Sequence, residues 1–99
     1  MISIDIATGL VSGGRFTAGC TFVWSNSSAR NVDVTPSSNF CTPSSFPVEA
    51  GKVSQEGTAA NPLPSPPFDF SINPNIWVGG PSNPHIQMPS RLANEKEVA

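Results

Sequence analysis

The chain has 99 residues, of which 12% are charged, 37% are hydrophobic and 11 are proline. This length suits one domain and excludes a TIM barrel or a two-domain enzyme. The net charge is −2 and the five basic residues are scattered, so the clustered positive charge that nucleic-acid binding needs is missing. The frequent prolines leave little room for a long helix, and no apolar run approaches the ~20 residues of a membrane span.

Alternating apolar and polar residues predict three strands in the first third of the chain. Residues 2–6 place three isoleucines on one face. Residues 16–24 predict a second strand, whose inner face runs from Phe16 to Trp24. Val32 and Val34 predict a third strand, which pairs antiparallel with the second if the turn between them is tight.

Proline separates the middle of the chain into extended segments. Residues 36–47 predict an extended loop whose aromatic side chains cover the edge of the core. Residues 46–51 predict a short edge strand, because proline within a strand is tolerated at an edge. Residues 61–67 contain four prolines and predict an exposed, polyproline-like arm.

The last third of the chain predicts one strong strand and two weak ones. Phe68, Phe70 and Ile72 alternate with polar residues, residues 76–78 form a brief apolar run, and residues 83–89 predict a closing strand. Residues 1–90 are interpreted as one domain and residues 91–99 as a polar C-terminal tail. The fold class predicted is all-β: a small antiparallel β-sandwich of about seven short strands with long Pro/Ser-rich loops.

Two cysteines, Cys20 and Cys41, predict a disulfide, since an even number in a small domain is typical of one. The alternative is a pair of buried thiols that never meet. A disulfide favours an extracellular or surface location. Residues 1–6 lack the basic and apolar regions of a secretory signal, which argues against an extracellular location.

Few residues offer catalytic or metal-binding chemistry. His85 is the only histidine, and no serine lies in a G-x-S-x-G context. Soft metal donors are present and together resemble a copper set: Cys20, Cys41, His85 and Met88. His85 and Met88 stand three apart, so on a strand they point to opposite faces. The sequence therefore predicts no cofactor and no metal, with His85 and Met88 as the metal candidates if one exists.

Two features favour contacts with proteins. Residues 64–67 read Pro-Ser-Pro-Pro, which fits the P-x-x-P spacing of ligands for SH3-type domains, although no basic residue is adjacent. Trp77 precedes a glycine pair that can leave its ring exposed. The interaction residues predicted are Pro62, Pro64, Pro66, Pro67 and Trp77.

The predicted strands resemble those of a cupredoxin-like β-sandwich. Residues 22–34, with Trp24 and Asn26, are similar to the family pattern V-x-W-x-N…H-x-V, and residues 46–51 are similar to its edge strand. Residues 68–85 resemble its Y-x-F…C-x-P-H run, but Ser82 stands where the family has its ligand cysteine. The family's first ligand histidine corresponds to a position near Arg30 or Asn31, where this chain has no histidine. The resemblance implies a sandwich, which an immunoglobulin-like domain shares, without most of the copper ligands.

Scarce catalytic residues, low charge and long proline-rich segments predict a non-enzymatic structural or interaction module. We expect it to self-associate or act as an assembly subunit through surface and edge-strand contacts. A copper-binding relative of the cupredoxins is the first alternative. A small hydrolase that uses His85 is the second. Protein is the expected partner, with no nucleic acid and no membrane span.

Overall fold

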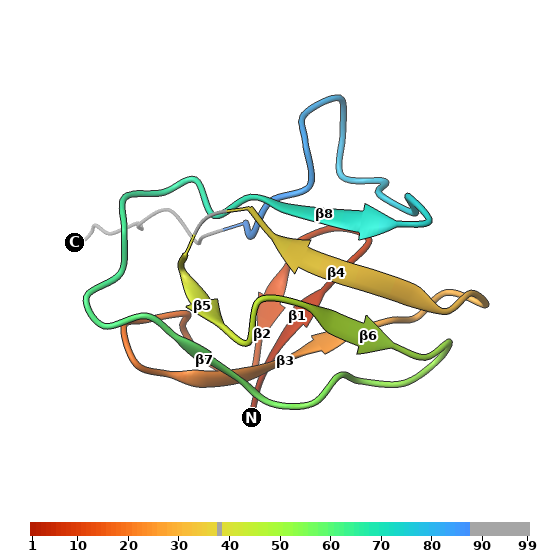
Figure 1. Ribbon diagram of the computed structural model, residues 1–99. Helices are drawn as coiled ribbons and strands as arrows, with labels where there is room; N and C mark the ends of the chain where they lie inside the picture. Colours follow the sequence, from red (N-terminus) through yellow and green to blue (C-terminus); the bar gives the residue numbers. More distant parts are fainter. Residues whose placement is uncertain (38, 88–99) are drawn as a thin grey trace.

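The computed structural model describes residues 1–37 and 39–87, and that part of the chain forms eight short strands in two sheets without a helix (Figure 1). The larger sheet has the order β2-β1-β3-β7-β5 and the smaller sheet the order β6-β4-β8. The predicted all-β, sandwich-like fold is confirmed, with eight strands instead of seven. The strands are β1 (Ile2–Asp5), β2 (Val11–Ser12), β3 (Thr21–Ser25), β4 (Val32–Pro36), β5 (Cys41–Thr42), β6 (Phe46–Val48), β7 (Gly57–Ala59) and β8 (Phe70–Asn73).

The antiparallel pairing predicted between the second and third strands is wrong. β3 lies in the larger sheet, parallel to β1 and antiparallel to β7, whereas β4 lies in the smaller sheet. The connection between them crosses from one sheet to the other, and the buried Asn26 holds it there. The Asn26 side-chain amide donates to the carbonyls of Arg30 (2.6 Å) and Val48 (3.1 Å), and Val48 belongs to β6 of the smaller sheet.

The strand predicted over residues 16–24 begins only at Thr21. Residues 17–20 form a turn in which the Cys20 amide donates to the Thr17 carbonyl at 3.1 Å, and Gly19 has a φ of +76°. Phe16 is nevertheless buried, as predicted. A left-handed glycine ends the extended backbone without removing the aromatic side chain from the core.

Aromatic rings from both sheets meet in the core. Trp24 of β3 is fully buried, and its ring centroid lies 4.8 Å from that of Phe70 in β8 and 5.9 Å from that of Phe46 in β6. Phe22 packs edge-on against Trp24 at 5.6 Å. Such tilted and edge-on pairs are favourable beyond the area they bury, so this cluster joins the two sheets.

The cysteines are not bonded, and the predicted disulfide is wrong. The Ala59 amide in β7 donates to the Cys20 carbonyl at 2.8 Å, and Ala59 also pairs with Cys41 of β5. Ala59 therefore stands between the cysteines, two strand spacings apart, which is about 10 Å. A disulfide needs Cα atoms within roughly 7 Å. The extracellular location that a disulfide favoured loses this support.

The C-terminal part of the described chain is less regular than predicted. Residues 76–78 form no strand, and the closing strand is reduced to single bridges, from His85 to Asp69 and from Gln87 to Leu10. Met88, the boundary at residue 90 and the tail at 91–99 lie outside the described residues. No helix long and apolar enough to cross a membrane occurs in the described ranges.

Removal of the Trp24 side chain should separate the two sheets. We expect Trp24→Ala to lower the free energy of unfolding by about 3–5 kcal/mol, because a large cavity replaces the ring. Urea denaturation followed by circular dichroism measures this loss. The control is Val78→Ala, since Val78 is 73% exposed. A loss for Trp24→Ala no larger than that for Val78→Ala contradicts the assignment.

The Cys41 thiol should make stability depend on alkaline pH. Burial raises its pKa from 9.0 to about 12, so above pH 9 the unfolded chain releases a proton that the folded chain retains. The free energy of unfolding should then fall between pH 9 and pH 12. Urea midpoints measured below pH 9 and at about pH 11, in reductant, should differ more in the parent protein than in Cys41→Ala. Equal differences in the two proteins contradict the burial of this thiol.

Candidate functional site

The edge strands of the two sheets differ in how well they are protected against pairing with a strand of another molecule. β2 and β5 have only two residues each. β6 pairs with β4 through Phe46 and Val48 and turns Pro47 toward the open side, where proline offers no amide hydrogen. Short strands and edge prolines both prevent unwanted strand pairing. β8, with four residues, is the longest edge strand in the described structure.

Along β8, the backbone amide and carbonyl groups of successive residues point alternately toward β4 and toward the open edge. The Ser37 amide donates to the Asp69 carbonyl at 2.9 Å, and this pair continues the β4–β8 register. Antiparallel partners alternate between bonded and non-bonded pairs, so Ser71 and Asn73 bond to β4 while Phe70 and Ile72 point their backbone groups outward.

Half of this open edge is covered by the segment that returns at residues 84–86. The Phe70 amide donates to the Pro84 carbonyl, and the Ile86 amide donates to the Phe68 carbonyl, both at 3.0 Å. Ile72 lies beyond this cover. Its place in the β4–β8 register points its amide and carbonyl away from β4, and no loop backbone within residues 1–37 and 39–87 bonds to them. The unpaired part of the edge is therefore centred on Ile72.

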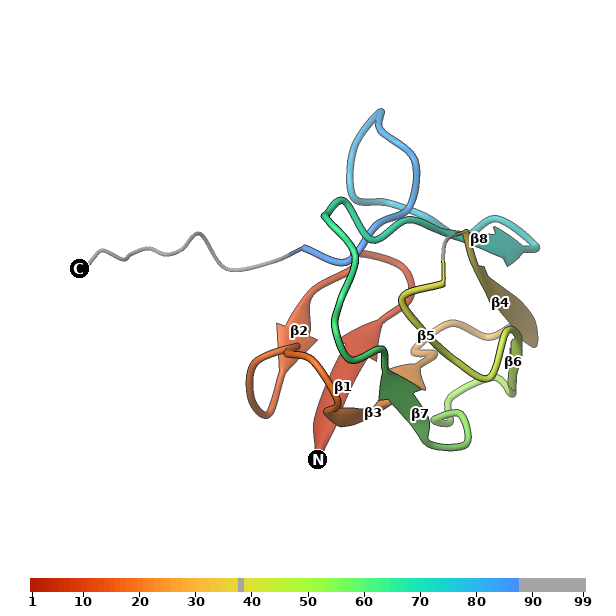
Figure 2. The same cartoon turned by 60° about the vertical axis from the view of Figure 1, so that its left-hand side comes forward.

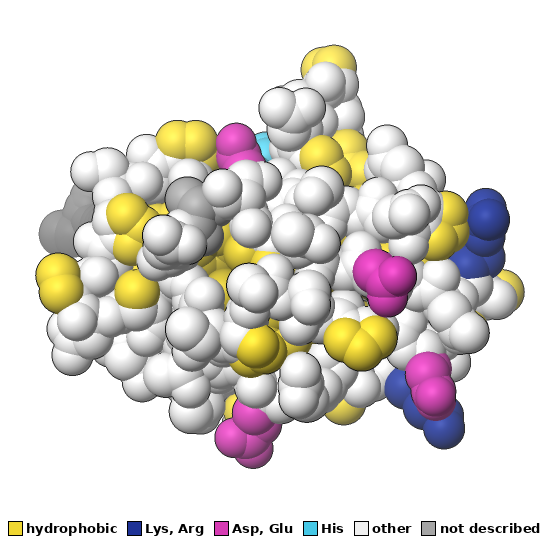
Figure 3. Space-filling model, in the orientation of Figure 1, with side chains coloured by type: hydrophobic (Ala, Val, Ile, Leu, Met, Phe, Trp, Pro, Cys, Tyr) yellow, Lys and Arg dark blue, Asp and Glu magenta, His cyan; other side chains and the backbone are white. Residues whose placement is uncertain are grey.

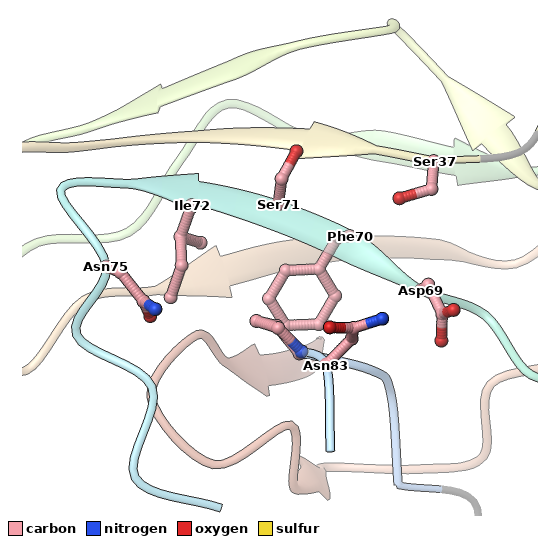
Figure 4. Close-up of a pocket in the computed structure, with 8 residues that line it drawn as sticks. Ser37, Asp69, Phe70, Ser71, Ile72, Asn75 and Asn83 are labelled. Carbon is pink, nitrogen blue, oxygen red and sulfur yellow. The ribbon is translucent and has the colours of Figure 1, made fainter. Parts of the chain in front are cut away.

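A groove of about 270 Å³ runs beside this part of β8 (Figure 4). The loop that follows β8 projects away from both sheets and returns at residue 84 (Figure 2). Asn75 and Asn83, which begin and end this loop, carry amides that line the groove, and Asp69 is its one charged residue. The full lining is Ser37, Asp69, Phe70, Ser71, Ile72, Asn75, Asn83 and Pro84.

A second hollow of about 290 Å³ adjoins the groove and shares Asp69 and Asn83 with it. Its remaining lining residues are Pro67, Ser82 and His85. Asp69 and His85 are direct antiparallel partners. The two backbone bonds at Phe70 and Ile86 flank this pair, which makes it a non-hydrogen-bonded pair with Cα atoms about 4.5 Å apart.

The imidazole of His85 is held in one orientation. Its Nδ1 lies 2.8 Å from the Asn83 carbonyl oxygen, and its ring centroid lies 5.6 Å from that of Trp77. A carbonyl oxygen only accepts hydrogen bonds, so Nδ1 is the donor. In the neutral ring, Nε2 then carries a free lone pair.

Of the candidates for catalysis and metal binding, His85 lines this hollow and neither cysteine does. Ser82, Asp69 and His85 line the same hollow, but within the described ranges the hydrogen bond of the imidazole goes to the Asn83 backbone and not to a serine or carboxylate. No group of three or more His, Cys, Asp or Glu residues positioned for a metal ion occurs in the described part. Nucleophilic catalysis needs a base within hydrogen-bonding reach of the nucleophile, and the hollow does not show that contact.

The predicted interaction residues lie apart from the Ile72 edge. Pro62, Pro64, Pro66 and Pro67 are exposed, while Leu63 between them packs against the core. Trp77 is half-buried and not fully exposed, and its ring lies edge-on to that of Phe70 with the centroids 6.1 Å apart.

The surface carries little charge. Charged side chains are few and scattered over the face in Figure 3. The Glu49–Lys52 pair, at 3.4 Å, joins neighbouring positions of one exposed turn and adds little stability.

Sequence patterns did not identify Asp69, Ile72, Asn75 and Asn83 as site residues. The absence of charge in residues 70–73 was a signal for an edge strand open to pairing.

A scan against protein-family models finds no match for this chain, and searches of curated proteins and of solved structures find no match either.

Proposed function

We propose that this protein is a non-enzymatic interaction module that associates with a second copy of itself through the open edge of β8. The observation that supports this is the unpaired backbone of Ile72, which lies beside a groove while the other edge strands are short or carry proline. An edge with free amide and carbonyl groups can accept another strand.

The alternation along β8 defines the register of such a pair. With the two-fold axis at Ile72, each Ile72 amide donates to the Ile72 carbonyl of the second copy. Ser71 then stands opposite Asn73 of the second copy, as a non-hydrogen-bonded pair whose side chains are close. The smaller sheets of the two copies join into one sheet of six strands.

The composition of β8 fits a second copy as the occupant. Residues 70–73 carry no charge, so two copies in this register bring no like charges opposite each other, which would destabilise the pair. Ser71 and Asn73 are exposed. The Ser71 hydroxyl donates to the Thr35 carbonyl at 3.3 Å, so across the pair its oxygen can accept from the Asn73 amide of the second copy. A contact of this kind is isologous, uses the same patch on both subunits, and closes as a dimer. The low net charge of −2 adds little repulsion.

Cysteine cross-linking tests the register. In a Cys20→Ser background, the pair Ser71→Cys and Asn73→Cys should form two intermolecular disulfides, because non-bonded pairs place Cα atoms about 4.5 Å apart, within disulfide range. The readout is the covalent dimer on a non-reducing gel after mild oxidation. Light scattering should show a dimer of the parent protein at high concentration.

The matched control is Asp33→Cys with Thr35→Cys. These exposed residues have the same spacing and lie on β4, which has a neighbour on each side. The proposal predicts no covalent dimer for this control. Equal cross-linking of both variants, or a parent protein that stays monomeric at all concentrations, contradicts it.

A further inference from the structure

We infer that His85 and Asp69 bind a divalent transition-metal ion of the Zn²⁺ class in the hollow beside β8. This hollow adjoins the groove beside Ile72 and shares Asp69 and Asn83 with it, but the inference does not rest on the proposed association. It retains His85, one of the two metal candidates expected from the sequence, and pairs it with Asp69 instead of Met88.

The first support is the pairing of the two side chains. Asp69 and His85 stand directly opposite each other on adjacent segments, and side chains of such a pair project to the same face with Cβ atoms roughly 4.5–5.5 Å apart. Both side chains line one hollow. With the imidazole held as it is, rotation of the Asp69 side chain can therefore bring a carboxylate oxygen and Nε2 of His85 to a common ion.

The second support is the hydrogen bond of the imidazole. The Asn83 carbonyl accepts from Nδ1 at 2.8 Å, which leaves Nε2 as the free nitrogen. Histidines that ligate metals usually donate their other ring hydrogen to a carbonyl or carboxylate, which fixes the tautomer and the ring orientation. The structure already holds His85 in this arrangement.

The third support is the remaining lining of the hollow. Ser82 and Asn83 add a hydroxyl and an amide oxygen, and about 290 Å³ leaves room for an ion with bound waters. Imidazole together with carboxylate suits zinc, nickel or copper, whereas magnesium and calcium prefer oxygen ligands alone. With two strong protein ligands, the site is weaker than a four-ligand structural zinc site.

The single histidine makes the test specific. Zn²⁺ is titrated into the folded protein while the two imidazole carbon–proton signals are followed by NMR, and calorimetry measures the affinity. The signals should shift in proportion to occupancy, and the ring-nitrogen shifts before titration should report the Nδ1–H tautomer. Mg²⁺ and Ca²⁺ should leave the signals unchanged.

Variants identify the ligands. Asp69→Asn should weaken Zn²⁺ binding at least about tenfold, since loss of an outer-shell partner alone costs that much, and His85→Ala should abolish it. Asp33→Asn, an exposed carboxylate on β4, and Cys20→Ser should bind as the parent does. Circular dichroism establishes that each variant is folded. Binding that survives His85→Ala, or that is lost in Cys20→Ser, overturns the assignment.

Discussion

The contact of Trp24 with Phe70 joins the two sheets, and the position of the β8 edge depends on it. Trp24 comes from the centre of the larger sheet, and Phe70 begins the edge strand of the smaller one. With Phe70 and Ile72 fixed toward the core, the alternation of a strand leaves Ser71 and Asn73 on the outer face. The same alternation aims the backbone of Ile72 at the open edge. A packing contact therefore determines which polar groups remain available for association.

The other edges of the two sheets are protected against strand pairing, so the open part of β8 is the edge that remains for association. Pro47 removes the amide that β6 would otherwise present, and residues 84–86 bond to one half of β8. That same cover brings His85 opposite Asp69. One short returning segment thus closes part of the edge, walls the groove and forms the pair for which we propose metal binding.

The sequence predicts the strands with strong alternation, but not the way in which they pair. Residues 2–6, 32–34 and 68–72 have large apolar side chains at every second position, and each contributes to a strand. β7 was missed because Gly57 and Ala59 are small; a Cβ at Gly57 would lie 2.8 Å from the rings of Phe22 and Phe46. The same strand separates the cysteines, so the even number of cysteines, on which the disulfide prediction rested, was misleading. Asp69 and His85 meet only through tertiary pairing, which no local pattern reports.

Hydrogen exchange at the Ile72 amide tests the central claim, that this edge is open in one copy and paired between two. The Phe70 amide, which bonds to Pro84 within the chain, serves as the internal reference. Exchange measured by NMR at low and high protein concentration should show Ile72 protection that grows with concentration, while Phe70 protection stays constant. An Ile72 exchange rate that is the same at both concentrations, when light scattering shows a monomer at the low concentration and a dimer at the high one, contradicts the account.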